Sequence, residues 1–156
     1  MEQSFKIMSA VDLSDFSPAT VRYSVWLAMK LNADLLMVSV INQRDLDMIQ
    51  RAMAGYESFS FSNYLDDQAQ DRERKMKEMF EAASPGRINC RYIVKNGIPY
   101  RELLTVIEEE KPDLMVLGTK GRSNLADVVI GSTARKMFRR SPIPLISVPA
   151  GYSGLA

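Results

Sequence analysis

The sequence contains no histidine, and this absence excludes several classes of enzyme. Ser-His-Asp and Cys-His nucleophiles need an imidazole to accept a proton, and many metal sites use imidazole as a ligand. Histidine is also the side chain whose ordinary pKa lies closest to neutral pH. Any catalysis by this chain would therefore rely on carboxylates, lysines or metal-bound water, and the absence favours a binding protein over an enzyme.

Cysteine and long apolar runs are also scarce. The single cysteine, Cys90, excludes an intrachain disulfide and any metal site that needs several cysteines, so we expect a small buried hydrophobic residue there. No segment reaches the ~18 consecutive apolar residues of a membrane span, and Asp12 interrupts the N-terminal apolar run before it attains the length of a signal peptide. These absences predict a cytoplasmic protein without membrane contact.

Neither sign of charge is in excess. Lysine and arginine number 20 against 19 aspartates and glutamates, and the net charge is +1. A charge this small gives no general attraction for nucleic acid or anionic lipid, so neither is expected as a partner. The 156 residues, of which 46% are hydrophobic, suit one globular domain spanning residues 1–156.

Apolar runs alternate with helix-forming stretches along the whole chain. Strands are expected at residues 5–11, 35–41, 88–94, 113–117 and 142–149. Helices are expected from Ser17, as N-cap, to residue 33, and then at 66–83, 99–111, near 125–130 and at 134–140, whereas residues 42–61 are expected to be irregular. The alternation predicts an α/β fold, a doubly wound, five-stranded parallel sheet with helices on both faces.

The most specific motif follows the fourth expected strand. Residues 118–124 read Gly-Thr-Lys-Gly-Arg-Ser-Asn, and residues 131–133 read Gly-Ser-Thr at the start of the last helix. Glycines let the backbone approach a ligand closely, and the unpaired N–H groups of a helix start attract phosphate. A simple tight turn is the alternative, but three glycines and a Ser-Thr pair favour a phosphate site.

Further candidate residues lie where other strands end. In a doubly wound sheet, ligands bind at the carboxyl ends of the strands, and Asp12, Val40 and Gly118 occupy such positions. Asp12 has two compatible interpretations, as a ligand contact or as a cap for the N–H groups of the loop that follows. Arg139 and Arg140 suit the last turn of a helix, where the helix dipole favours cations, and do not indicate a nucleic-acid patch.

The aromatic residues of the expected irregular segment leave two interpretations open. Tyr56, Phe59 and Phe61 form either a satellite core or a surface for a partner.

Taken together, these motifs resemble the universal stress protein family over essentially the whole chain. The family's glycine motif matches Gly118, Gly121, Gly131 and Ser132 in its spacing. The first strand ends in Val-Asp at residues 11–12, Gly-Ile-Pro at 97–99 fits the family's Gly-x-Pro, and the proline-flanked run at 144–149 fits its closing strand. A Walker A loop is absent, and the glycine loop follows the wrong strand for a Rossmann fingerprint.

The resemblance implies a dimeric α/β domain, of the adenine nucleotide alpha hydrolase-like type, that binds ATP with or without Mg²⁺. It implies that Ala10 and Asp12 lie by the ribose and that Val40 holds the adenine through its backbone. The residues expected around the ribose and phosphates are Gly118, Gly121, Arg122, Ser123, Asn124, Gly131, Ser132 and Thr133. Lys120 stands where the family often has histidine, and it is a candidate for a phosphate contact.

The resulting hypothesis is a cytoplasmic, dimeric, adenine-nucleotide-binding protein of stress response or signalling. Dimerisation is expected through residues 145–148 at the sheet edge, because an exposed strand edge favours pairing. Two alternatives stay open: a slow ATPase, for which Asp12 is the candidate base, and a nucleotide-free dimerisation module. No catalytic residue and no metal ligand is assigned.

Overall fold

The computed structural model describes residues 3–83, 85–120 and 130–155. Its centre is a five-stranded sheet in which every neighbouring pair is parallel and the strand order is β3-β2-β1-β4-β5. The strands are β1 (Lys6–Ala10), β2 (Asp34–Asn42), β3 (Cys90–Gly97), β4 (Leu114–Gly118) and β5 (Leu145–Val148). The predicted fold class is therefore confirmed.

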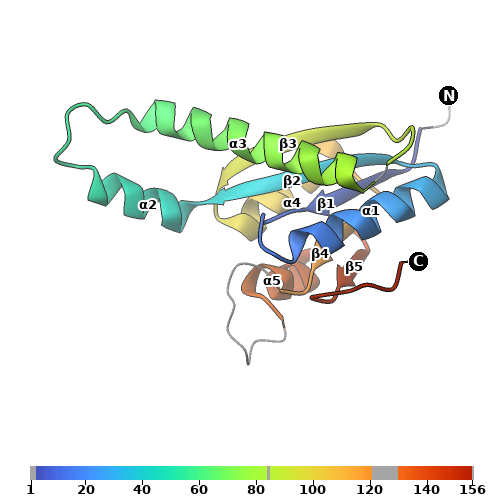
Figure 1. Cartoon of the computed structure of the whole chain (residues 1–156). Coiled ribbons are helices and arrows are strands. Elements are labelled where there is room, and N and C mark those ends of the chain that lie inside the picture. The colour runs from blue at the N-terminus through green and yellow to red at the C-terminus, as the bar shows by residue number, and fades with distance from the viewer. Residues whose placement is uncertain (1–2, 84, 121–129, 156) are drawn as a thin grey trace.

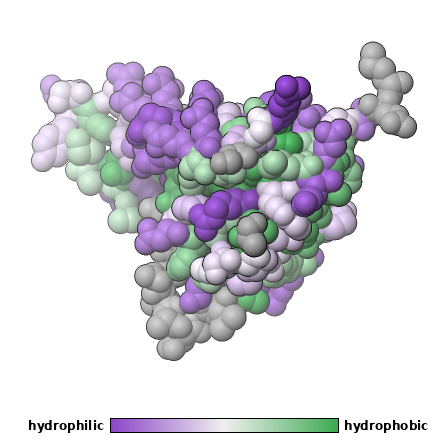
Figure 2. Space-filling view, turned by 45° about the vertical axis from the view of Figure 1, so that its right-hand side comes forward, coloured by the Kyte–Doolittle hydropathy of each residue, from purple (hydrophilic) through white to green (hydrophobic). Residues whose placement is uncertain are grey.

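Five helices accompany the strands in the described part of the chain. They are α1 (Ser17–Leu31), α2 (Gln43–Ala52), α3 (Phe61–Ala82), α4 (Pro99–Glu110) and α5 (Ser132–Arg140). Figure 1 shows α1 and α3 on one side of the sheet and α4 on the other, while α2 and the adjoining half of α3 project beyond the sheet. Figure 2 shows hydrophilic side chains gathered over the upper part of the molecule, where α3 lies.

Alternation along the strands divides the core into two layers. On β1, Ile7 belongs to the layer under α1 and α3, and its neighbour Met8 belongs to the layer under α4 and α5. Both side chains are fully buried. Since β2 and β4 alternate in the same way, the sheet is apolar on both faces, as expected of parallel strands covered by helices.

Left-handed residues end two of the helices where the sequence predicts their ends. Asn32 has φ 51° after α1, and Lys111 has φ 50° after α4, immediately before Pro112. A left-handed cap residue satisfies the last carbonyl groups of a helix, and proline cannot continue one. These two stops return the chain to β2 and β4, respectively.

Four expectations about local structure are wrong. Ser17 is the first residue of α1 and not its N-cap, which is Phe16. Residues 42–61 are not irregular throughout, because α2 occupies half of them, and α3 begins at Phe61 rather than at residue 66. The third strand runs from Cys90 to Gly97, two to three residues later than expected. A fifth expectation, the helix near residues 125–130, lies mostly outside the described residues and stays a prediction.

The aromatic residues at 56–61 differ in burial, and a partner surface there stays a prediction. Tyr56 is 63% exposed, whereas Phe59 and Phe61 are half-buried. The ring of Phe59 lies 6.0 Å from that of Tyr64 on α3, centroid to centroid. A small aromatic contact therefore ties the α2–α3 connection to α3 and leaves Tyr56 facing solvent.

Gly97 ends β3 just before α4, and we predict that a side chain at this position destabilises the fold. Its φ is 145°, and an added Cβ would lie 2.7 Å from Glu102 Oε1. Gly97→Ala should lower the free energy of unfolding by about 1–2 kcal/mol, because alanine is strained at this φ. Urea denaturation measures the change.

The matched control is Gly55→Ala, where nothing lies within 4 Å of the added Cβ, and its effect should stay within about 0.5 kcal/mol. The double variant Gly97→Ala/Glu102→Ala removes the contact and keeps the strained φ. Full recovery of stability in that variant would show that the contact, and not the backbone, requires glycine.

Candidate functional site

The carboxyl ends of three adjacent strands form the floor of a cavity of about 440 Å³. Ala10 ends β1, Val40 lies near the end of β2, and Gly118 ends β4. The helix that follows β1, α1, packs on one face of the sheet, and α5, which follows β4, packs on the other, so these two strand ends form a switch point of the sheet. Such a switch point is where open α/β sheets bind ligands.

Four helices begin at the wall of this cavity. One lining residue lies at or near the start of each helix: Ser17 for α1, Arg44 for α2, Pro99 for α4 and Ser132 for α5. The N-terminal end of a helix carries a partial positive charge from its unpaired N–H groups. Four such ends directed at one cavity favour an anionic ligand there.

The loop between β1 and α1 is fixed by Asp12. Its Oδ1 accepts a hydrogen bond from the backbone N–H of Ser14 at 3.0 Å and another from the Ser17 hydroxyl at 2.8 Å. Leu13, between them, has a φ of 62°, which is unfavourable for a bulky side chain. Asp12 therefore has the capping role that the sequence allowed, and it lines the cavity at the same time.

Gly118, the last residue of β4, lies close to Thr20 of α1. A Cβ built on it would be 3.0 Å from Thr20 Oγ1 and 3.2 Å from the Lys120 carbonyl oxygen. Because backbone and a buried side chain surround it, no larger residue fits without a shift. Packing alone therefore favours glycine at this position of the motif.

The start of α5 carries no side-chain cap, because its N-cap residue is Gly131. The Gly131 N–H donates to the Thr119 carbonyl at 2.7 Å, which holds the helix start beside the end of β4. The next residues, Ser132 and Thr133, line the cavity. A glycine N-cap and two hydroxyl residues leave the first amides of α5 available to an anion.

Val40 offers its backbone carbonyl at the opposite wall. Arg72, a largely buried cation on α3, donates from Nη1 to Ser39 Oγ at 2.9 Å and to the Val40 carbonyl at 3.4 Å. A carbonyl oxygen has two lone pairs, so Val40 can accept one more hydrogen bond from a ligand. The long helix α3 is in this way connected directly to the cavity wall.

The structure brings eight of the twelve predicted site residues together. All eight line the cavity: Ala10, Asp12, Val40, Gly118, Lys120, Gly131, Ser132 and Thr133. The other four, Gly121, Arg122, Ser123 and Asn124, lie outside the described residues. The structure shows that these eight residues lie around one cavity, while the ligand-binding role of each residue stays a prediction.

Sequence reasoning missed the wall contributed by α2. Asn42, Arg44 and Asp45 line the cavity, and all three fall in the segment expected to be irregular. Asn42 Oδ1 accepts a hydrogen bond from the Arg44 N–H at 3.0 Å, as an N-cap does. An asparagine followed three residues later by an aspartate is a helix-start signal that could have been used.

Cys90 lies on β3 outside this cavity. Burial raises the pKa of its thiol to about 11, because the thiolate is poorly solvated there. It packs against the apolar layer under α1 and α3, as expected of a small hydrophobic residue. In the described ranges, no three histidine, cysteine, aspartate or glutamate side chains gather as metal ligands would, so Mg²⁺ remains a prediction tied to a bound nucleotide.

Comparison with known proteins identifies the family. A model of the universal stress protein family matches residues 4–149. The chain belongs to the universal stress protein family. Among curated members, the universal stress protein MJ0577 of Methanocaldococcus jannaschii is 22% identical over 154 residues, which cover 92% of this chain and 93% of the relative.

Solved structures of the family share the fold. The structure of MJ0577 covers 97% of this chain and 100% of its own, with a TM-score of 0.76 and 20% identity. A universal stress protein in complex with cAMP covers 96% and 100%, with a TM-score of 0.64 and 21% identity. One from Archaeoglobus fulgidus in complex with dAMP covers 94% and 98%, with a TM-score of 0.60 and 11% identity. At these identities the likeness shows the fold alone.

Across the part of the chain that the structure describes, none of the helices has the length and apolar character that a membrane span requires.

The structural role of Asp12 can be separated from its charge. Asp12→Asn keeps an Oδ1 acceptor for Ser14 and Ser17, so the free energy of unfolding should stay within about 0.5 kcal/mol of the unmodified chain. Asp12→Ala loses both hydrogen bonds and should cost about 1–2 kcal/mol. Urea denaturation of both variants measures this, and equal destabilisation by the two would show that the charge, rather than the acceptor, holds the loop.

Proposed function

We propose that this universal stress protein binds an adenine nucleotide, with ATP as its ligand, in the cavity between the ends of β1 and β4. It acts as a cytoplasmic stress-response or signalling protein, built as one nucleotide-binding domain over residues 1–156. The observation that carries this proposal is the start of α5, a helix whose glycine N-cap supplies no side-chain cap to its first amides, beside a cavity of about 440 Å³. Nucleotide binding, and not turnover, is the proposed output.

The phosphates are assigned to the β4–α5 side of the cavity. The first turn of α5 contains no acidic residue, so nothing on the helix offsets the positive potential of its N-terminal end. The hydroxyl groups of Ser132 and Thr133 add donors there, and Lys120, which follows β4 closely, adds a positive charge. Backbone amides, hydroxyls and a lysine are the groups with which proteins commonly bind phosphate.

The base is assigned to the β2–α4 side. Val38, Leu103 and Leu117 give this wall apolar surface, which suits the flat faces of a purine. The Val40 carbonyl can accept a hydrogen bond from the exocyclic amine of adenine, whereas guanine presents a carbonyl oxygen at the same ring position. The cAMP and dAMP complexes of similar fold both contain adenine, which supports the same choice here.

A homodimer through β5 completes the proposal. β5 is the edge strand next to β4, and the carbonyls of Pro144 and Val148 accept hydrogen bonds from β4-side amides at 3.0 and 2.9 Å. Because backbone groups alternate along a strand, those of Leu145 and Ser147 face away from β4. A second copy of β5 could pair with these groups and remove the open edge.

The phosphate assignment is tested at the N-cap of α5. Gly131 has φ −67° and ψ 159°, which both asparagine and aspartate adopt readily as N-cap residues. Gly131→Asp should leave stability unchanged or slightly higher, yet lower ATP affinity at least about tenfold, or ~1.4 kcal/mol, relative to Gly131→Asn. Titration calorimetry measures ATP and AMP binding.

Gly131→Asn is the matched control, since it has the same size and caps the helix without a charge. AMP should be weakened less than ATP by the aspartate, because AMP carries fewer phosphates. Equal ATP affinity in the two variants would place the phosphates elsewhere and overturn the assignment.

Dimerisation is tested at Ser147. Ser147→Pro removes one N–H from the open edge and leaves the β4 pairing intact, because the groups that face β4 belong to its neighbours. The variant should be monomeric and folded at tens of micromolar concentration, whereas Ser147→Ala should be a dimer. Sedimentation equilibrium measures the mass, and a monomeric unmodified chain or a dimeric Ser147→Pro variant would refute the β5 interface.

A further inference from the structure

The outer side of α4 and α5 carries a group of positive side chains, which we call the basic face: Arg101, Arg135, Lys136, Arg139 and Arg140. We propose that the basic face, together with the adjacent ring of Phe138, is a docking surface for an acidic peptide segment of a partner protein. The proposal does not depend on nucleotide binding, since none of these residues lines the cavity.

Helical spacing places the four cations of α5 on one side. At 100° per residue, Arg135, Arg139, Lys136 and Arg140 span about 140° of the helix circumference. The buried residues Ala134 and Met137 lie on the opposite side, against the core. The cations therefore form one continuous, solvent-facing stripe about 8 Å long between the first and last of them.

The stripe is joined to α4 through the ring of Tyr100. Lys136 Nζ lies 4.7 Å from the ring centroid, Arg140 Cζ 5.0 Å and Arg101 Cζ 5.7 Å. Arg101 also donates from Nε to the Tyr100 hydroxyl oxygen at 2.9 Å. Tyr100 is only 9% exposed, so the ring organises the three cations and is itself covered by its surroundings.

No carboxylate of a described residue pairs with any member of the basic face. The contrast is α3, where Arg74 and Lys75 share Asp71 and Lys77 pairs with Glu73. Like charges three or four residues apart on a helix destabilise it by a few tenths of a kcal/mol per pair. The helix dipole offsets this at Arg139 and Arg140 but not at Arg135, which lies in the first turn, where cations are disfavoured.

An acidic partner would convert this repulsion into attraction. Guanidinium groups match carboxylates in geometry, and three of the four cations of α5 are arginines. Cations four residues apart on a helix are ~6 Å apart along its axis, close to the ~6.6–7 Å between alternate side chains of an extended peptide. The spacing therefore suits a segment in which acidic residues alternate with others.

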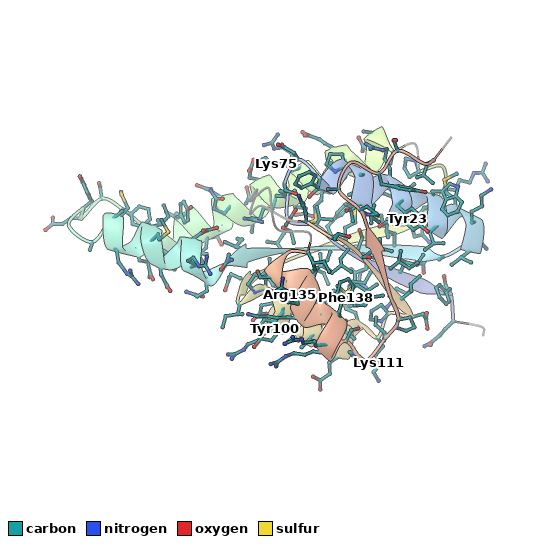
Figure 3. All side chains as sticks on the ribbon, turned by 90° about the horizontal axis from the view of Figure 1, so that it is seen from below. Tyr23, Lys75, Tyr100, Lys111, Arg135 and Phe138 are labelled. Atoms are coloured by element: carbon teal, nitrogen blue, oxygen red, sulfur yellow. The ribbon has the colours of Figure 1, made fainter. Side chains whose placement is uncertain are left out.

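Phe138 makes a peptide a better match than a polyphosphate chain. Its side chain is 44% exposed, and it lies three residues from Arg135 on the neighbouring stripe of α5. Figure 3 shows Arg135 and Phe138 on the same helix. An exposed ring beside a row of cations provides a contact for one apolar side chain, and the net charge of +1 lacks the general basicity of nucleic-acid binders.

The test uses the full chain without nucleotide and a fluorescently labelled peptide of 11 residues. Glutamate alternates with alanine in this peptide, and its central residue is leucine. Fluorescence anisotropy at ~0.1 M salt measures binding, where charges more than ~10 Å apart are largely screened. Arg135→Gln/Arg139→Gln should weaken binding about tenfold and leave the Tyr100 contacts in place.

The matched control is Arg51→Gln/Arg87→Gln, which removes the same charge from exposed positions outside the basic face and should change affinity less than twofold. Replacing the central leucine of the peptide by alanine should weaken binding about threefold to the unmodified chain and not at all to Phe138→Ser. Thermal unfolding verifies that every variant folds.

Three results would overturn the proposal. The first is no measurable binding to the unmodified chain, and the second is equal weakening by the control pair. The third is tighter binding of a six-nucleotide RNA, or of vesicles containing phosphatidylserine, than of the peptide. Two results together support it. Arg135→Gln/Arg139→Gln weakens peptide binding about tenfold, and the leucine-to-alanine change in the peptide weakens binding to the unmodified chain but not to Phe138→Ser.

Discussion

The parallel pairing of β1 with both β2 and β4 is the constraint on which the rest of the structure depends. β1 is buried on both faces, and its register with its two neighbours brings three strand ends to one edge of the sheet. From that edge the chain must leave toward opposite faces, since α1 covers one layer and α5 the other. The cavity is the space that this divergence leaves open, so its position follows from the sheet order and not from any one loop.

The same topology determines the electrostatics of the cavity. A right-handed crossover returns each chain segment to the starting end of the sheet, so every helix that follows a strand begins at the carboxyl edge. Their positive ends therefore converge without any charged side chain being needed. The residue at each N-cap position decides whether a side chain already bonds to the first N–H groups of that helix. Asn42 caps α2 with its own side chain, whereas Gly131 leaves the start of α5 open.

The sequence allowed the sheet, its parallel class and eight of the residues that line the candidate cavity to be predicted. Apolar runs identify buried strands because both faces of a parallel sheet are covered, and the spacing of the glycines located the β4–α5 connection. The helix α2 was missed because it buries little besides Leu46, so its pattern is mostly polar. The N-cap of α1 was missed because the Ser17 hydroxyl donates to Asp12 instead of accepting from its own helix. Tertiary partners of this kind cannot be read from local sequence.

Arg72 illustrates the same limit for the site. Nothing in an exposed, charged helix indicates that one arginine of the series is buried and reaches the Val40 carbonyl across the sheet edge. That contact, and the first turn of α2, connect the projecting α2–α3 segment to the cavity wall.

Stability of α5 links the two proposed surfaces. With nine residues it is too short to persist alone, and only Ala134 and Met137 are fully buried beneath it. An anion at its N-terminus and an acidic segment on its outer side would each stabilise the same short helix. If either ligand orders α5, thermodynamic linkage requires that it favour the other to the same extent. Because α5 is short and buries few side chains, its stability depends on what binds to it. Ligand binding in the cavity at its N-terminus can therefore change the affinity of its outer side for a partner.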